Sequence, residues 1–298
     1  MIFDFRLKVF QTVAEYLSFT KAAKTLLISQ PAVTRHINEL EKQLGIRLFR
    51  RLGSGIELTA EGDLLQSYAR KIFSNYKAFE EELGRIQNVN SGSLLMGAST
   101  TISQYILPGI LAQFKKRYPA IKVQLFSGNT EAIENMLLAE QIDFGLIEGN
   151  SNLVQIHYED FVRDEIVLVA RVGNRLLQKQ EIALNQLPEI PLVLREAGSG
   201  TLDVIEAALK KNHILLSDLN VEMQIGSTEG IKQYVQNSDA AAFLSVHTIT
   251  RELAANQLMI VDIRSFEMMR TLQFISLHGR ISHVANVFQS FCLSRYNK

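Results

Sequence analysis

Polar residues near the start of the sequence carry side chains suited to reading the edges of DNA bases. Arg can bond bidentately to guanine, and Gln or Asn to adenine, in the major groove. Pro31, Arg35 and Asn38 share one face at helical spacing, and Gln30 and Thr34 flank them. The predicted base-reading set is Ser29, Gln30, Pro31, Thr34, Arg35 and Asn38. The alternative interpretation is an amphipathic helix whose polar face is merely solvated.

Two short helices would have to position these side chains. Ser18 is a good N-cap for the first, because its hydroxyl can accept a free backbone N–H of the next turn. Ala22 and Ala23 are small enough to let a second helix approach closely. The second helix has Pro31 in its first turn, where a missing N–H costs nothing, and ends at Gly45. Its inward-facing residues are predicted from their spacing to be Val33, Ile37, Leu40 and Leu44.

A basic hairpin is predicted directly after the second helix. Two short apolar runs flank Gly53, Ser54 and Gly55, as in a β-hairpin. Arg50 and Arg51 lie at the base of this hairpin, where we expect them to contact DNA phosphates. Helix, turn, helix and basic hairpin together form a winged helix-turn-helix.

This segment resembles the DNA-binding domain of LysR-type transcriptional regulators. The residues that carry the resemblance are Ser18-Phe19-Thr20, Ala22-Ala23, Leu26, Ser29-Gln30-Pro31-Ala32-Val33-Thr34-Arg35, Ile37, Leu40-Glu41, Leu44-Gly45, Leu48-Phe49-Arg50-Arg51, Leu58-Thr59 and Gly62. The resemblance implies a DNA-binding regulator that forms a homo-oligomer, a dimer or a tetramer. It also implies that double-stranded operator DNA and RNA polymerase are partners, and that a small molecule controls the protein.

Charge is distributed unevenly along the sequence. The 298 residues include 31 basic and 31 acidic ones, so the formal net charge is zero. Residues 1–58, however, hold nine Lys or Arg against five Asp or Glu, which suits a protein that contacts phosphate with one end only. The single cysteine, Cys292, lies in an apolar run typical of a core. We expect a cytoplasmic protein with no disulfide, signal peptide or membrane partner.

A long helix is predicted to follow the hairpin, capped by Thr59 and running to about Asn88. Apolar residues recur along it with the spacing of a coiled-coil seam. We expect dimerisation through Leu65, Ile72, Tyr76, Phe79 and Leu83. The alternative is an amphipathic helix lying on its own domain. A polar hinge is predicted at residues 88–93.

From residue 94 the pattern alternates between strands and helices, which predicts an α/β fold with parallel strands and helices on both faces. A second such unit follows a charged stretch near Asp160 to Asp164. The two units resemble the two-lobed α/β fold of type II periplasmic-binding proteins, the effector domain of the LysR family. The expected domains are residues 1–59, the linker helix and hinge at 60–90, and the effector domain at 91–298. Lobe I would comprise about 91–161 and 267–298, and lobe II about 162–266.

Two hydroxyl-rich turns are candidate effector sites. Each would open a helix, so that free backbone amides, the helix dipole and hydroxyls favour a small anion. The predicted effector-binding residues are Ser99, Thr100, Thr101, Ser199, Gly200, Thr201 and, more weakly, Thr228. In the family, the turn at Ser99–Thr101 and the turn at Ser199–Thr201 face each other across the cleft between the lobes. The alternative is that these residues are simply N-caps.

The sequence gives little support for an enzymatic function. Gly198-Ser199-Gly200 lacks the spacing of a nucleophile elbow, and the six His show no metal-ligand spacing. We therefore expect no catalytic residues, metal or cofactor. The favoured function is transcriptional regulation of the LysR type in response to a small, anionic effector. The alternative is a cytoplasmic solute-binding or catalytic α/β protein with an N-terminal interaction module.

Overall fold

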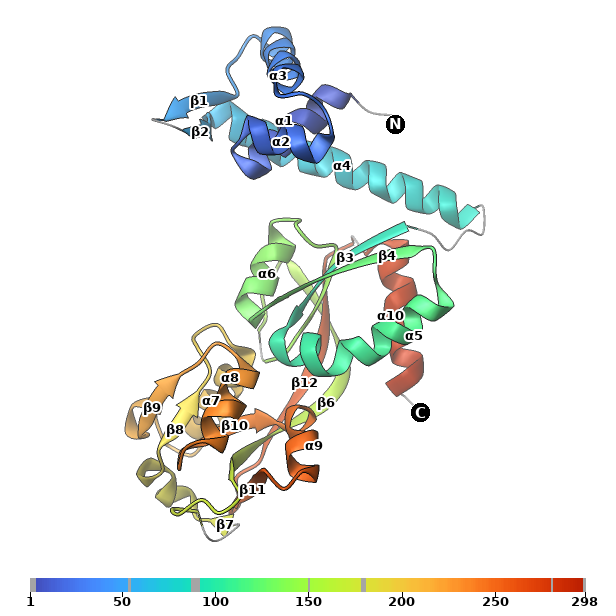
Figure 1. Cartoon of the computed structure of the whole chain (residues 1–298). Helices are drawn as coiled ribbons and strands as arrows, with labels where there is room; N and C mark the ends of the chain where they lie inside the picture. Colours follow the sequence, from blue (N-terminus) through green and yellow to red (C-terminus); the bar gives the residue numbers. More distant parts are fainter. Residues whose placement is uncertain are drawn as a thin grey trace. The chain divides into compact units, whose positions relative to one another are not determined.

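A computed structural model describes residues 4–52, 55–86, 92–149, 151–177, 181–279 and 281–296 of the chain. The chain divides into two compact units, residues 1–82 and 83–298. We call them the head and the effector unit (Figure 1). The expected hinge lies largely outside the described residues, and its last two members, Gly92 and Ser93, belong to a strand.

The head contains the predicted winged helix-turn-helix and most of the long helix that follows it. Its elements are α1 (Phe5–Tyr16), α2 (Phe19–Leu26), α3 (Gln30–Leu44), β1 (Phe49–Leu52), β2 (Gly55–Leu58) and α4 (Ala60–Ile86), whose last residues extend beyond it. Ser18 caps α2 by accepting the Lys21 N–H at 3.3 Å, and Gly45 ends α3 with φ +69°. The start and stop signals in the sequence are therefore confirmed.

The core of the head lies between α1, α2 and α3. Its fully or nearly buried residues are Val9, Phe10, Val13, Ala14, Ala22, Ala23, Val33, Ile37, Leu40 and Leu48. The prediction that Leu44 faces inward is wrong, because this last residue of α3 is 45% exposed. The buried position on that turn belongs to Glu41, whose carboxylate accepts the Leu48 N–H at 2.8 Å and pairs with Arg47 at 2.7 Å. A buried carboxylate thus fastens α3 to the first strand of the hairpin.

The first turn of α4 packs against Arg47 and Leu48, just before the first strand of the hairpin. Thr59 Oγ1 accepts the Gly62 N–H at 3.0 Å, which confirms the predicted cap, and donates to the Arg47 carbonyl at 2.7 Å. A Cβ on Gly62 would lie 2.2 Å from the Leu48 carbonyl oxygen. Only glycine allows the helix to approach the backbone this closely.

The effector unit is built on one mixed sheet, and its principal strand order is β4-β3-β5-β12-β6-β10-β8-β9. Its strands are β3 (Gly92–Ser99), β4 (Ile121–Gly128), β5 (Phe144–Ile147), β6 (Ile156–Arg171), β7 (Glu181–Ile182), β8 (Leu192–Leu194), β9 (Val221–Gln224), β10 (Ala241–Ser245), β11 (Leu258–Ile263) and β12 (Met268–Leu277). Strands β3, β4 and β5 pair in parallel, as predicted, whereas β12 runs antiparallel to both β5 and β6.

Helices cover both faces of this sheet. They are η1 (Ile102–Ile106, a π-helical turn), α5 (Leu107–Arg117), α6 (Thr130–Leu138), η2 (Leu184–Glu189), α7 (Gly200–Lys211), η3 (Leu216–Asp218), α8 (Thr228–Gln236), α9 (Val246–Ala254) and α10 (His283–Tyr296). Lobe I comprises β3, β4, β5, α5, α6 and α10, and lobe II comprises β8 to β11 with α7, α8 and α9. Cys292 is fully buried in the core of lobe I, and burial raises the pKa of its thiol to about 12. It is the inert core residue that the sequence predicted.

Strands β6 and β12 run through both lobes (Figure 1). The charged stretch near Asp160 to Asp164, after which the second unit was predicted, lies inside the 16-residue strand β6. Phe161 and Asp164 are buried while Asp160 is exposed, so the strand carries charge where it passes from one lobe to the other. The lobes therefore share a pair of strands.

Candidate DNA-binding and effector sites

The outward face of α3 presents the predicted base-reading residues. Pro31, Arg35 and Asn38 are exposed, and the Arg35 side chain is 71% exposed with Glu39 3.7 Å away. At the start of the helix, Gln30 Nε2 donates to Thr34 Oγ1 at 3.1 Å. Ser29 Oγ accepts the Ala32 N–H at 3.3 Å and is therefore committed to capping.

The hairpin carries the second group of predicted DNA-binding residues. Arg50 pairs with Glu57 across the two strands, and Nε of Arg50 forms an ion pair with that carboxylate. The Arg50 side chain nevertheless remains 67% exposed. Arg51 faces Ile56 in the strand register, and its side chain lies outside the described part of the structure.

Helix α4 divides its apolar residues between two surfaces. Leu65 is partly buried against the head core and Ala69 is fully buried, so this part of the predicted seam packs on its own domain. Ile72 and Phe79 are 39% and 50% exposed. Leu64 and Tyr68 are also exposed on this helix, although they were not among the predicted dimerisation residues. Tyr76 is partly buried, and the Leu83 side chain lies outside the described residues.

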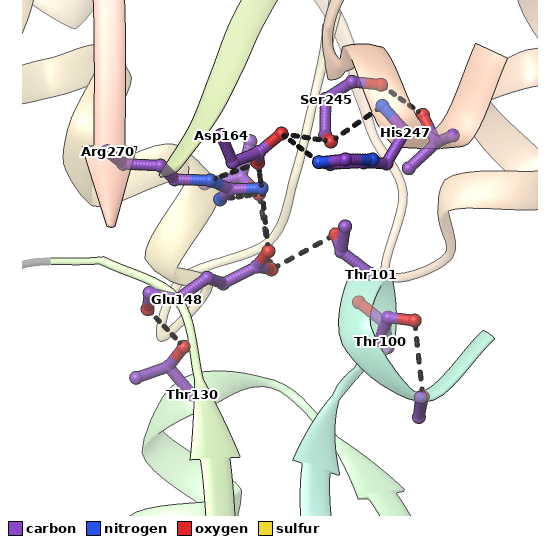
Figure 2. A network of polar contacts seen from close by, with 11 residues as sticks. Thr100, Thr101, Thr130, Glu148, Asp164, Ser245, His247 and Arg270 are labelled. Carbon is purple, nitrogen blue, oxygen red and sulfur yellow. Dashed lines mark hydrogen bonds and ion pairs between the residues drawn. The ribbon is translucent and has the colours of Figure 1, made fainter. Parts of the chain in front are cut away.

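The two predicted effector turns lie at helix starts on opposite lobes and meet at one carboxylate. Thr101 Oγ1, next to η1, and Thr201 Oγ1, in α7, each donate to Glu148 Oε1 at 3.3 Å. Glu148 directly follows β5 and is 1% exposed. Figure 2 shows its side chain extending between the lobes.

Arg270 occupies the centre of this network (Figure 2). Its Nη2 lies 2.7 Å from Glu148 Oε2 and 2.6 Å from Asp164 Oδ2, and its Nε donates to Asp164 at 2.7 Å. Nη1 donates to Thr201 Oγ1 at 2.9 Å. Asp164 also accepts the Ser245 hydroxyl at 2.6 Å, with His247 Nε2 3.8 Å away. Buried charges persist only when paired and hydrogen-bonded, and these contacts supply that pairing.

Sequence reasoning missed Glu148, Asp164 and Arg270. One signal was available, because Glu148 is a polar residue directly after a strand of four apolar or small residues. Asp164 was noted only as part of a charged stretch, and Arg270 stands near the start of strand β12 with no motif around it.

The lobes touch directly around Glu148. Thr130 Oγ1 in lobe I donates to the Glu148 carbonyl at 2.7 Å, and a Cβ on Gly200 would lie 1.8 Å from that same oxygen. The Glu131 N–H donates to the Gly198 carbonyl at 3.2 Å. Gly200 therefore contributes to the predicted site through its lack of a side chain.

A second set of contacts bridges the lobes through η1 and α8. The Tyr105 hydroxyl donates to Glu229, and Lys232 lies 2.9 Å from Glu229 and 2.7 Å from Glu252. Burial and the bond to Glu229 raise the pKa of the Tyr105 phenol, so it stays a neutral donor. Thr228, the weaker effector candidate, is buried in the first turn of α8 while its neighbour Ser227 caps the helix. Among the described residues, Thr228 is not part of the Glu148 network.

Three of the predicted hydroxyls are buried without a hydrogen-bond partner among the described residues: those of Ser99, Thr100 and Ser199. Buried polar atoms are nearly always satisfied, so such groups indicate a place where a ligand or water completes the bonding. A groove of about 570 Å³ adjoins the network at Gly149 and Arg270 and is also lined by Asn152 and Arg163.

Across the described ranges, no three His, Cys, Asp or Glu side chains are grouped so that they could hold a metal ion. No described helix combines the length and the apolar character needed to cross a bilayer.

Comparison with known proteins shows the family. Residues 5–63 match the model of the bacterial regulatory helix-turn-helix protein, lysR family, and residues 87–297 match that of the LysR substrate binding domain. The HTH-type transcriptional regulator CysL of Bacillus subtilis is 34% identical over 269 residues, which cover 90% of this chain and 89% of CysL.

Two solved structures have the same fold. The regulatory domain of Synechocystis PCC6803 CcmR, in complex with 2-PG, is 26% identical with a TM-score of 0.64, covering 70% of this chain and 99% of that domain. Full-length CbnR complexed with its target DNA is 20% identical with a TM-score of 0.69, covering 99% of this chain and 100% of CbnR. These matches disfavour the solute-binding or catalytic alternative. The chain belongs to the LysR family of transcriptional regulators and is a DNA-binding regulator that responds to a small effector, not an enzyme.

Proposed function

We propose that α3 enters the major groove of an operator and reads it with Gln30, Thr34, Arg35 and Asn38. The exposure of Arg35 and Asn38 supports this assignment, since both side chains are available to base edges. Ser29 and Pro31 shape the start of α3 and bring its first backbone amides towards DNA. Arg50 and Arg51 on the hairpin bind the phosphates.

The protein works in the cytoplasm as a homo-oligomer, a dimer that can pair into a tetramer. The exposed stripe of Leu64, Tyr68, Ile72 and Phe79 on α4 supports a second copy of the same helix as its partner. Tyr76 and Leu83 continue the seam. RNA polymerase is a further partner at the promoter.

The effector is a small anion held between the lobes, where its binding sets their relative angle. The observation that carries this proposal is the meeting of Thr101 and Thr201, from helix starts on opposite lobes, at one negatively charged group. The unpartnered hydroxyls of Ser99, Thr100 and Ser199 add donors beside it. The 2-PG ligand of CcmR is such an anion and supports this class.

Valine substitutions at Thr100 and at Thr201 test the effector site. Thr100→Val and Thr201→Val keep the side-chain shape and delete a hydroxyl worth about 1.5–3 kcal/mol towards a charged ligand, roughly 10- to 150-fold in affinity. We would titrate 2-phosphoglycolate, inorganic phosphate and sulfate by calorimetry and measure DNA binding by gel shift. Both variants should lose anion binding and keep DNA binding.

Thr228→Val, at another helix start, is the matched control and should bind like the unmodified protein. Unchanged anion affinity in Thr201→Val would place the effector site elsewhere. If no anion binds the unmodified chain or any variant, the effector is not of this class.

A further inference from the structure

The Glu148 carboxylate is bonded in the way that a bound anionic ligand would be. One oxygen accepts hydroxyls from Thr101 and Thr201 at 3.3 Å, and the other lies 2.7 Å from the Arg270 guanidinium. These donors come from lobe I, lobe II and the shared strand β12. One carboxylate therefore ties together all three parts of the effector unit (Figure 2).

Arg270 would remain in position if Glu148 left. Asp164 holds the guanidinium through both Nε and Nη2, at 2.7 and 2.6 Å, and is itself held by Ser245 at 2.6 Å. Arg270 faces two carboxylates and can exchange one of them for an external anion without losing its fixed orientation. That exchange leaves the number of charged groups around the guanidinium unchanged.

The surroundings also provide a place for the displaced side chain. Gly149 follows Glu148 with φ +110°, a conformation that glycine adopts readily. The groove of about 570 Å³ begins at Gly149 and Arg270 and is lined by Arg163. A carboxylate that turned into this groove would meet water and a guanidinium instead of an apolar core.

We infer that Glu148 is an internal occupant of the effector's anion subsite, and that Arg270 is an effector-binding residue. The anionic group of the effector replaces the Glu148 carboxylate on Thr101, Thr201 and Arg270. This inference rests on the proposed effector function. It adds that the Glu148 carboxylate already bridges the lobes when no ligand is bound. The effector therefore competes with Glu148 for Thr101, Thr201 and Arg270, and its anionic group then bridges the lobes instead.

The test is Glu148→Gln, which keeps the shape of the side chain and removes its charge. Loss of the competing charge should tighten binding of 2-phosphoglycolate and inorganic phosphate about tenfold or more, measured by calorimetry on the full chain. The control is Glu134→Gln, a 5% exposed carboxylate in the same lobe that accepts the Tyr158 hydroxyl at 2.8 Å. Its anion affinity should not change. Glu148→Ala, which vacates the subsite, should tighten binding at least as much, and thermal unfolding would check that each variant is folded.

The outcomes separate this inference from the proposed function. Tighter binding in Glu148→Gln, or binding seen only in the Glu148 variants, supports the inference. If the unmodified chain binds anions, Thr201→Val loses them and folded Glu148 variants bind no more tightly, the effector site stands and Glu148 is only a structural ion-pair partner. If neither the unmodified chain nor the Glu148 variants bind any anion, both proposals fail.

Discussion

The head and the effector unit use charge in opposite ways. Two of the side chains proposed to meet DNA, Arg35 and Arg50, are 71% and 67% exposed, and their ion pairs lie at the surface. In the effector unit the Arg270 and Glu148 side chains are 0% and 1% exposed. DNA brings its own dense negative charge to a wet surface. In the interior, by contrast, the Arg270 guanidinium is paired with carboxylates of the protein itself.

This difference predicts how substitutions in the two regions should behave. An exposed ion pair contributes about 0–1 kcal/mol, so charge can be removed from the head with little loss of stability. Removing one partner from a buried ion pair costs about 3–5 kcal/mol. Function and stability should therefore separate in the head and remain coupled in the effector unit.

The largest expected effect is that of Arg270→Gln. The substitution leaves Glu148 and Asp164 buried near each other without their shared cation, and we expect a loss of about 3–5 kcal/mol in the free energy of unfolding. Urea denaturation of the full chain measures it. Arg50→Ala, which removes an exposed cation from the head, is the matched control. A loss below about 1 kcal/mol for Arg270→Gln would remove the contrast between the two regions.

Arg35→Ala should have an intermediate effect, confined to DNA. Loss of a bidentate base contact should cost about 1–3 kcal/mol on a preferred sequence and relax the preference at one base pair. Selection from a random DNA pool followed by gel shift measures both quantities. The unfolding midpoint should stay unchanged, because this side chain is mostly exposed. An intact sequence preference would mean that another element reads the bases.

The smallest expected effect is that of Glu57→Gln on the hairpin. Arg50 pairs with Glu57, so removing the carboxylate frees a cation for phosphate while stability changes by about 0–1 kcal/mol. Affinity should rise alike for all DNA sequences, and the dependence of log affinity on log salt should steepen by up to roughly one unit. Binding isotherms at several salt concentrations provide the measurement. A sequence-dependent gain would contradict a phosphate-binding role for Arg50.

The sequence specified the head more completely than the effector site because the signals in the head are local. Ser18, Pro31, Gly45 and Thr59 each act on a turn next to themselves, and the structure confirms every one of these caps and breaks. The error at Leu44 arose because helical spacing alone does not show that the chain turns away at Gly45 and buries Glu41 instead.

The network around Glu148 could be predicted only in part. Helix starts drew attention to Thr101 and Thr201, which do converge. Their common partner, Glu148, is 47 and 53 positions away, and Arg270 meets Asp164 over 106 positions. Such pairing depends on how β12 enters the sheet, which no local pattern in one sequence reveals. The alternation of apolar and polar residues that marks a strand was obscured in β6, because adjacent charged residues lie where this strand passes from one lobe to the other.

The insertion of β12 between β5 and β6 has a consequence for how the protein is made. The ribosome delivers the chain from its N-terminal end, and domains generally fold as units as they emerge. The elements of the winged helix-turn-helix have left the ribosome long before residues 268–277, the strand that brings Arg270 into place. A nascent chain can therefore fold its head before the strand that carries Arg270 emerges, and the contacts of Arg270 with Glu148 and Asp164 can form only after that strand has been made.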